Sequence, residues 1–170
     1  EIGLPASSLE LEITESLAMD TPVENTRTLH NLRNIGVGVA IDDFGTGHSS
    51  LGYLKDFPIS CLKLDRSFIM HLETEPNDVI IVSAAIELAH DLGMDVVAEG
   101  VETSKQVEYL YRLRCDIIQG YYYCKPLPAG EVIRYITDRN KSPSHPTGNN
   151  IPPMDVLVID DDEFICTMMA

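Results

Sequence analysis

The stretch VGVAIDDFGTG, residues 37–47, combines the features of a buried strand with an acidic end. Its first residues form a short apolar run without the alternation of a half-exposed strand, which is typical of a strand covered on both faces in a parallel sheet. Asp42 and Asp43 follow at once, and Gly45 and Gly47 then allow a tight loop. Acids at the end of a buried strand are costly unless they meet a positive partner.

Four other stretches repeat this pattern of an apolar run that ends in polar groups: LELEITES (9–16), CLKLD (61–65), VVAEGVE (96–102) and DIIQGY (116–121). The carboxyl ends of parallel strands share one edge of a sheet, so we expect these polar groups to form one site. The residues are Glu12, Glu15, Lys63, Asp65, Glu99, Glu102 and Gln119. Carboxylate-rich sites without Cys or His favour hard divalent cations.

Helical segments separate the strands, at about residues 22–35, 49–54, 77–92, 104–114 and 129–136. This alternation predicts an α/β fold of right-handed β-α-β units around a parallel sheet. Polar groups at nearly every strand end favour a TIM-like (β/α) barrel over an open doubly wound sheet, which binds ligands at one crevice. Five strands do not close a barrel of eight, so we expect about three more upstream of Glu1.

Capping signals mark the start of two helices. Thr21, Pro22 and Glu24 predict a capping box with proline at the first helical position, and Thr103 and Gln106 predict a second box. For the helix at 77–92, the apolar spacing predicts a packing face of Ile80, Ile81, Ala84, Ala85 and Leu88.

The composition is that of an acidic globular protein. The 170 residues carry 12 Lys and Arg against 27 Asp and Glu, a net charge of −15. This charge argues against DNA or RNA polymers as ligands but not against a small phosphate ligand, since bound metal reverses the local field. The cysteines form no C-x-x-C pair, and no apolar run reaches membrane-spanning length. We therefore expect a cytoplasmic protein with reduced thiols, and leave open an upstream membrane anchor in a longer parent protein.

Five collinear motifs resemble the C-terminal part of an EAL-type cyclic di-GMP phosphodiesterase domain: LEITES, IDDFGTGHSSL, LKLDRSF, VVAEGVET and QGYYYCKPLP. The resemblance covers about residues 1–136. It implies a modified β/α barrel that hydrolyses cyclic di-GMP to linear pGpG with Mg²⁺ or Mn²⁺. It also implies a homodimer formed through the barrel.

The resemblance implies metal ligands at four positions. Glu12 resembles a ligand of the first metal, Asp42 the carboxylate that bridges both metals, and Asp43 a ligand of the second metal. Glu99 resembles the acid that holds the second metal and its water. Two divalent ions about 3.5–4 Å apart supply a hydroxide at neutral pH and neutralise the charge of the phosphoryl group.

Other residues are implied to act around the metals. Lys63 resembles the lysine beside the attacking water, and Gln119 resembles the glutamine near the cluster, so Lys63, Glu99 and Gln119 form the expected catalytic set. Glu15 and Glu102 resemble acids that anchor the loop after the Asp42 strand. We group Asp65, which starts the next loop, with these supporting residues.

The chain departs from the family pattern in two ways. His48 stands where the family usually has tyrosine, in the loop after the Asp42 strand. The second departure is that the glutamate of the EAL tripeptide and a metal-binding asparagine, which in the family belong to upstream strands, are absent from these 170 residues. We therefore expect an active parent phosphodiesterase and an inactive 170-residue fragment.

Three other functions stay open from the sequence. The first is a degenerate domain that binds cyclic di-GMP as a receptor without cleaving it. The second is a protein-interaction module that dimerises near the Asp42 loop. A barrel glycosidase is a weaker third, because adjacent Asp42 and Asp43 with Lys63 suit metal and phosphate better than a sugar acid–base pair.

The tail predicts a second domain. Residues 137–153 are rich in Pro, Ser and Asn, which is typical of a linker. The apolar run 156–159 then delivers Asp160 and Asp161, with helix-like sequence after Asp162. Residues 154–170 resemble the first strand and the acidic, Mg²⁺-holding pocket of a doubly wound receiver domain, although a chance strand with an acidic end is the alternative. A receiver implies a histidine kinase as partner.

Overall fold

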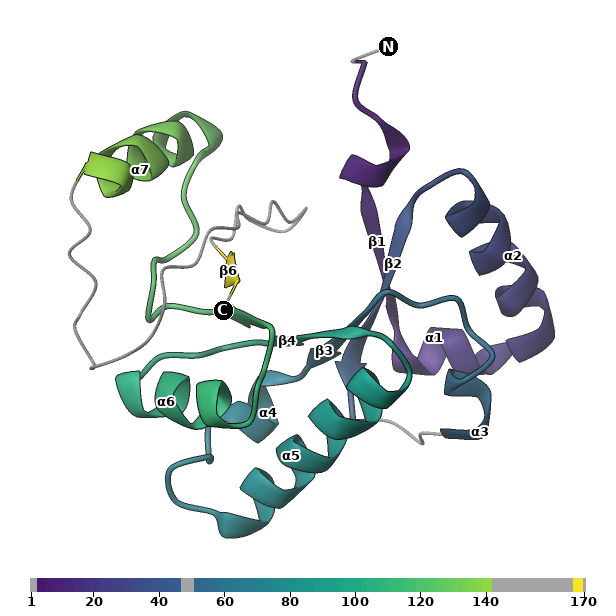
Figure 1. Cartoon of the computed structure of the whole chain (residues 1–170), viewed down its shortest axis with the longest axis horizontal. Helices are drawn as coiled ribbons and strands as arrows, with labels where there is room; N and C mark the ends of the chain where they lie inside the picture. The colour runs from purple at the N-terminus through teal and green to yellow at the C-terminus, as the bar shows by residue number, and fades with distance from the viewer. Residues whose placement is uncertain (1–2, 47–50, 142–166, 170) are drawn as a thin grey trace.

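The computed structural model describes residues 3–46, 51–141 and 167–169, and its centre is a six-stranded sheet (Figure 1). Five strands are parallel: β1 (Glu10–Thr14), β2 (Gly38–Phe44), β3 (Cys61–Leu64), β4 (Asp95–Ala98) and β5 (Ile117–Gln119). Their order in space is their order in the chain, so every crossover advances the same way. This is the winding of a β/α barrel, and a doubly wound sheet would reverse direction at one point.

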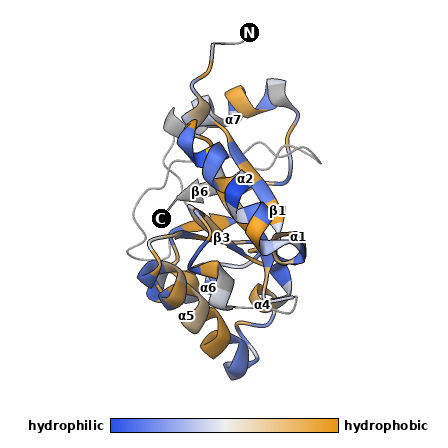
Figure 2. Cartoon of the chain, turned by 90° about the vertical axis from the view of Figure 1, so that its right-hand side faces the viewer, coloured by the Kyte–Doolittle hydropathy of each residue, from blue (hydrophilic) through white to orange (hydrophobic). Residues whose placement is uncertain are grey.

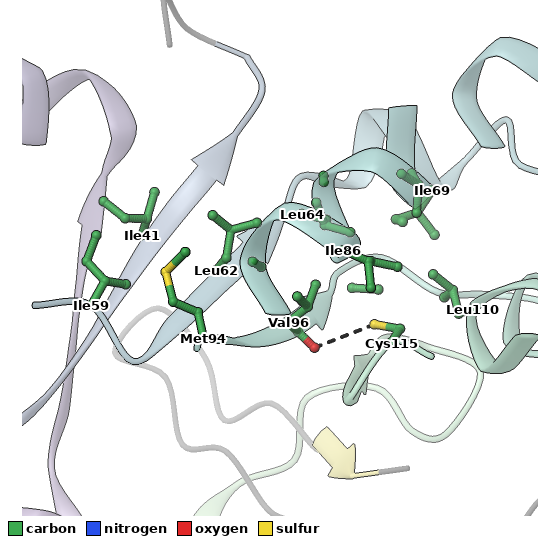
Figure 3. Close-up of a cluster of buried hydrophobic side chains, with 14 of the residues drawn as sticks. Ile41, Ile59, Leu62, Leu64, Ile69, Ile86, Met94, Val96, Leu110 and Cys115 are labelled. Atoms are coloured by element: carbon green, nitrogen blue, oxygen red, sulfur yellow. Dashed lines mark hydrogen bonds between the residues drawn. The ribbon is translucent and has the colours of Figure 1, made fainter. Parts of the chain in front are cut away.

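Helices α1 to α6 connect the five parallel strands, and the core between them and the sheet lies on one face. They are α1 (Glu15–Asp20), α2 (Pro22–Asn34), α3 (Leu51–Leu54), α4 (Arg66–Ile69), α5 (Pro76–Asp91) and α6 (Ser104–Arg112). The 3-10 helix η1 (Ala6–Ser8) precedes β1, and α7 (Ala129–Lys141) follows β5. In the core, side chains of the strands such as Leu62 and Val96 pack against Ile86 of α5 and Leu110 of α6 (Figure 3). This packing fixes the strands whose ends carry the polar groups.

Alternate residues of the strands point to opposite faces, and both faces are apolar in the middle of the sheet. Val39, Ile41, Leu62 and Val96 belong to the helix-covered core. Their neighbours on the other face, which we call the inner face, form a second buried cluster of Ala40, Cys61, Val97 and Ile117. The prediction of strands buried on both faces is confirmed for β3, whose residues are all buried.

Strand β1 differs from that prediction. Four of its five residues are exposed, and Ile13 alone is partly buried. β1 is the edge of the sheet, so its inner face and its free side have no further strand against them among the described residues. The apolar run of residues 9–14 therefore indicated a strand correctly but not its burial.

The two predicted capping boxes have different outcomes. Thr103 accepts a hydrogen bond from the Gln106 N–H and Gln106 reaches back to the Thr103 N–H, which confirms the second box. Pro22 opens α2 as predicted, but the Thr21 side chain makes no capping bond, so the first box is wrong. Helix α1 ends next to Thr21 and fixes its backbone away from the usual extended N-cap conformation.

The predicted packing face of α5 is also wrong in part. Val82, Ala85, Ile86 and Ala89 are buried, whereas Ile80 is 66% exposed and Ile81 47% exposed. Figure 2 shows hydrophobic residues along α5, and these occupy exposed as well as buried positions, so the apolar spacing fits two rotations of the helix. Packing of α5 against β3 and β4 selects between them.

The tail is described only in part. Helix α7 continues to Lys141, so the first residues of the predicted linker are helical. The apolar run 156–159, Asp160 and Asp161 lie outside the described residues, as does His48. Residues Thr167–Met169 form β6, antiparallel to β5, where helix-like sequence was expected. No helix in the described part of the chain is long and apolar enough to cross a membrane.

Candidate functional site

The centre of the site is the ammonium group of Lys63, which is 4% exposed on β3. Its Nζ lies 2.6 Å from Glu12 Oε2, 2.8 Å from Glu99 Oε1 and 3.2 Å from Asp42 Oδ1. These acids come from β1, from the residue after β4 and from β2. The predicted convergence of polar groups from separate strand ends is therefore present around one nitrogen.

Strand alternation explains why these side chains meet. Ala40, Cys61 and Val97 occupy the inner face of the sheet, and Asp42, Lys63 and Glu99 each follow two residues later. Glu12 pairs in register with Ala40 on the neighbouring strand, and so shares this face. The same spacing from Ile117 places Gln119 there, and its side chain is buried.

The site carries more negative than positive charge. Burial opposes a charge on Lys63, but the attraction of Glu99 and Glu12 outweighs it and raises the pKa of Lys63 above its ordinary value. Burial raises the pKa of Glu99 despite Lys63, with repulsion from Asp42 and Glu12 adding to the effect. One lysine among several carboxylates leaves an unbalanced negative charge, which favours the binding of further cations.

Asp43 is set apart from its neighbour by the backbone. Its φ of 54° is left-handed, and the pairing of β2 with β3 is irregular between Ile41 and Phe44. We expected the strand to end at the two acids; it instead continues to Phe44 with this irregularity, which lets successive side chains escape strict alternation. Burial, followed by repulsion from Asp42, raises the pKa of Asp43.

The loop after β2 is anchored by Glu15. This side chain is 2% exposed, and its Oε2 accepts the Gly45 N–H at 2.9 Å. Gly45 has a φ of +94°, and a Cβ there would lie 2.8 Å from the Phe68 ring, so a larger residue would push the loop off α4. The contact is the one that the family resemblance implies for Glu15.

Glu102 contacts α4 in the described part of the chain. Its Oε1 binds Arg66 Nη2 at 2.7 Å, which ties the loop after β4 to α4. Asp65 also belongs to this region, where its Oδ1 accepts the Ser67 N–H and caps α4. Glu15 thus holds the described part of the loop after β2, and Glu102 holds the loop after β4 against α4.

Gln106 is a buried residue that the sequence indicates only as part of a helix cap. Its Oε1 accepts the N–H groups of Glu102 and Thr103 at 2.8 and 2.9 Å, and its Nε2 donates to the Ile69 carbonyl at 3.1 Å. The capping box predicted the hydrogen bond with the Thr103 N–H. Nothing in the local sequence indicates the bond with the Ile69 carbonyl, which lies 37 residues away.

A cavity of about 190 Å³ adjoins the acidic cluster. Its walls include Glu99 and Gln119 from the strand ends together with Arg66, Gly100, Glu102, Gly120, Tyr121, Cys124 and Pro126. The volume is smaller than the roughly 300–1,000 Å³ of pockets that hold drug-sized molecules. It therefore suits one part of a larger ligand.

The carboxylates of Glu12, Asp42 and Glu99 meet around Lys63, and oxygen ligands of this kind suit a hard divalent cation. Among the described residues, no three His, Cys, Asp or Glu side chains already surround a common ion position. Lys63 holds the central position instead, so metal binding requires the carboxylates to turn from its ammonium group.

Fold and site together define the class: a β/α-barrel protein with an acid-and-lysine centre at the carboxyl ends of its strands. The EAL domain family model matches residues 1–126, and the chain belongs to the EAL domain family.

Known proteins support this assignment. The cyclic di-GMP phosphodiesterase RocR of Pseudomonas aeruginosa is 42% identical over 135 residues, which are 79% of this chain and 34% of RocR. The structure of the PaMucR phosphodiesterase in complex with c-di-GMP is 48% identical with a TM-score of 0.73, over 76% of this chain and 52% of that one. The manganese and cyclic di-GMP complex of Klebsiella pneumoniae BlrP1 is 31% identical with a TM-score of 0.69, over 73% of this chain and 32% of that one.

The chain is much shorter than the relatives that it matches. The chain spans 17% to 34% of the curated relatives that it matches first.

Proposed function

We propose that the protein containing this chain hydrolyses cyclic di-GMP to linear pGpG. The observation that carries the proposal is the buried Lys63 ammonium within 3.2 Å of carboxylates from three different strand segments. A phosphodiester at this position would meet a fixed positive charge where negative charge grows during its cleavage. Relatives that share the family and the fold are named for this activity.

We further propose that Glu12, Asp42, Asp43 and Glu99 hold two divalent ions, Mg²⁺ or Mn²⁺. When bound, these ions supply a hydroxide at neutral pH and neutralise the phosphoryl oxygens. The excess of carboxylates over Lys63 supports this proposal, and BlrP1 has been solved with manganese and its cyclic dinucleotide.

The remaining site residues orient and support. The raised pKa of Lys63 keeps its ammonium charged at neutral pH, so that it can donate hydrogen bonds to the attacking water or to the phosphate. Gln119 is buried and lines the same cavity as Glu99. Glu15 fixes the Gly45 end of the loop that follows Asp42 and Asp43.

Strand β1 is an exposed edge of the sheet among the described residues. We propose that about three further barrel strands, with the EAL glutamate and an asparagine ligand, lie upstream of Glu1 in the parent protein. The exposed edge and inner face of β1 support this proposal. The 170-residue chain by itself would then lack turnover.

The test uses the parent protein extended upstream, with cyclic di-GMP and Mg²⁺ or Mn²⁺, and follows pGpG by chromatography. Lys63→Ala removes the buried ammonium, and Lys105→Ala, which changes a lysine with a 74% exposed side chain, is the matched control. Product from the parent and the control but not from Lys63→Ala is the expected result. If the parent and both variants bind cyclic di-GMP but release no pGpG, the protein is a receptor and the proposed enzyme activity is wrong.

We also propose that the parent forms a homodimer through the barrel. The outer face of α5 supports this, because Ile80, Ile81 and Ala84 are exposed there and form an apolar stripe. Sedimentation of the parent and of its Ile81→Asp variant tests this proposal, and we expect a dimeric parent and a monomeric variant. If both are dimers, the contact lies elsewhere. If both are monomers, the homodimer is contradicted.

For the tail, we propose that residues 154–170 begin a receiver domain, with Asp160 and Asp161 in its acidic pocket and a histidine kinase as partner. A cytoplasmic location follows from these proposed partners. Incubation of the parent with acetyl phosphate tests the proposed receiver domain. If no aspartate becomes phosphorylated, the receiver proposal is wrong.

A further inference from the structure

We propose that Arg66 and Glu102 form a guanine-reading pair on the wall of the cavity beside Glu99 and Gln119. The inference rests on the proposed function, because it concerns the base of the same substrate. The starting point is the ion pair between Arg66 Nη2 and Glu102 Oε1, which are 2.7 Å apart and both line the cavity.

The pair is held at the cavity by its backbone surroundings. The Arg66 side chain crosses directly over Gly100, where a Cβ would lie 2.3 Å from Arg66 Cγ. Gly100 has a φ of +68°, so both its conformation and its missing side chain suit the crossing. On the other side, Gln106 accepts the Glu102 N–H at 2.8 Å and fixes the acid.

Both charged ends stay accessible to a ligand. The side chains of Arg66 and Glu102 are 53% and 44% exposed, in contrast to the buried Lys63. An ion pair this exposed contributes little to stability, so exchanging part of it for ligand contacts costs little. Arg66 is also the one cation among the described residues that line the cavity.

The chemistry of the pair matches guanine rather than adenine. An arginine donates two hydrogen bonds to O6 and N7 of guanine, and a carboxylate accepts from the N1–H and the 2-amino group. Adenine presents an amino donor in place of O6, which would face the arginine. Tyr121 and Pro126 supply apolar walls for a flat base, and the cavity of about 190 Å³ suits a single base.

The test measures dissociation constants of the parent protein for cyclic di-GMP and cyclic di-AMP, and KM and kcat for cyclic di-GMP. In Arg66→Ala we expect the Kd and KM for cyclic di-GMP to rise roughly tenfold or more, with kcat changed far less. The ratio of the two affinities should fall by a similar factor. Arg112→Ala, which breaks the surface pair with Glu108 on α6, is the matched control and should change nothing.

Cyclic di-IMP, which lacks the 2-amino group, tests Glu102. It should bind the wild type more weakly than cyclic di-GMP, and Glu102→Gln should narrow that difference. An equal loss of affinity for cyclic di-GMP and cyclic di-AMP in Arg66→Ala would mean that Arg66 contacts phosphate, and would overturn the inference. Unchanged affinities in Arg66→Ala, with an active wild type, would overturn it and leave the phosphodiesterase intact. A wild type that binds no cyclic di-GMP would overturn both.

Discussion

Replacing Lys63 by methionine isolates the role of the central ammonium. Methionine keeps an unbranched chain of similar length but removes the charge, so Glu12, Asp42 and Glu99 lose their shared partner. Removing one member of a buried ion pair typically costs about 3–5 kcal/mol. The Lys63 side chain is 5% exposed but its partners are 20–34% exposed, so water screens part of the repulsion. We expect a loss near the low end, about 3 kcal/mol.

The assay is urea unfolding of the 170-residue chain followed by circular dichroism, with and without Mn²⁺. A divalent ion replaces the missing positive charge, so Mn²⁺ should restore the variant; a ligand at 100 times its Kd contributes about 2.7 kcal/mol. Lys105→Met is the matched control, because its side chain is 74% exposed and its contact with Glu73 is 3.6 Å long. We expect a change below about 1 kcal/mol there.

Two results would refute this reasoning. If Lys63→Met costs no more than Lys105→Met, the acids do not depend on the ammonium for their neutralisation. If Mn²⁺ leaves the variant as unstable as before, the carboxylates that remain do not bind a divalent cation.

Three further predictions concern Gln106, Gly100 and Cys115. Gln106→Leu leaves the Glu102 and Thr103 N–H groups and the Ile69 carbonyl without their partner, so urea unfolding should show a loss of about 3 kcal/mol; a loss below about 1 kcal/mol would contradict the argument. Gly100→Ala should destabilise more than Gly93→Ala in the same assay, because both glycines are left-handed but only Gly100 has Arg66 within 4 Å; equal losses would rule out the contact. Burial raises the pKa of Cys115 to about 12 from 9.0, so its neutral thiol contributes stability that is present below pH 9 and lost as the pH rises towards 12. Native protein treated with iodoacetamide at pH 8 should therefore show no label on Cys115 by mass spectrometry, and early labelling there would contradict its burial.

The strands and the inner-face residues were predictable because period-two alternation acts locally. Once Asp42 was recognised as the end of a strand, the positions of Lys63 and Glu99 at equivalent ends followed from parallel pairing. The resemblance to the EAL family added roles that no single motif carries.

What the sequence did not predict depends on distant contacts. The rotation of α5 was ambiguous because Ile80 and Ile81 look as suitable for the core as Val82 and Ile86 do. The Arg66–Glu102 pair joins residues 36 apart, and neither the spacing nor the residue types single it out. The left-handed backbone of Asp43 was missed for a related reason, since the irregular pairing with β3 has no local sequence signal.

That left-handed backbone constrains which replacements the position accepts. With a φ of 54°, residue 43 favours aspartate, asparagine or glycine, and a β-branched residue would strain the turn. Asparagine would thus keep the fold and remove only the negative charge. Backbone geometry therefore does not oppose the replacement of this proposed metal ligand by asparagine, so the fold and the proposed metal binding can be separated by one substitution at this position.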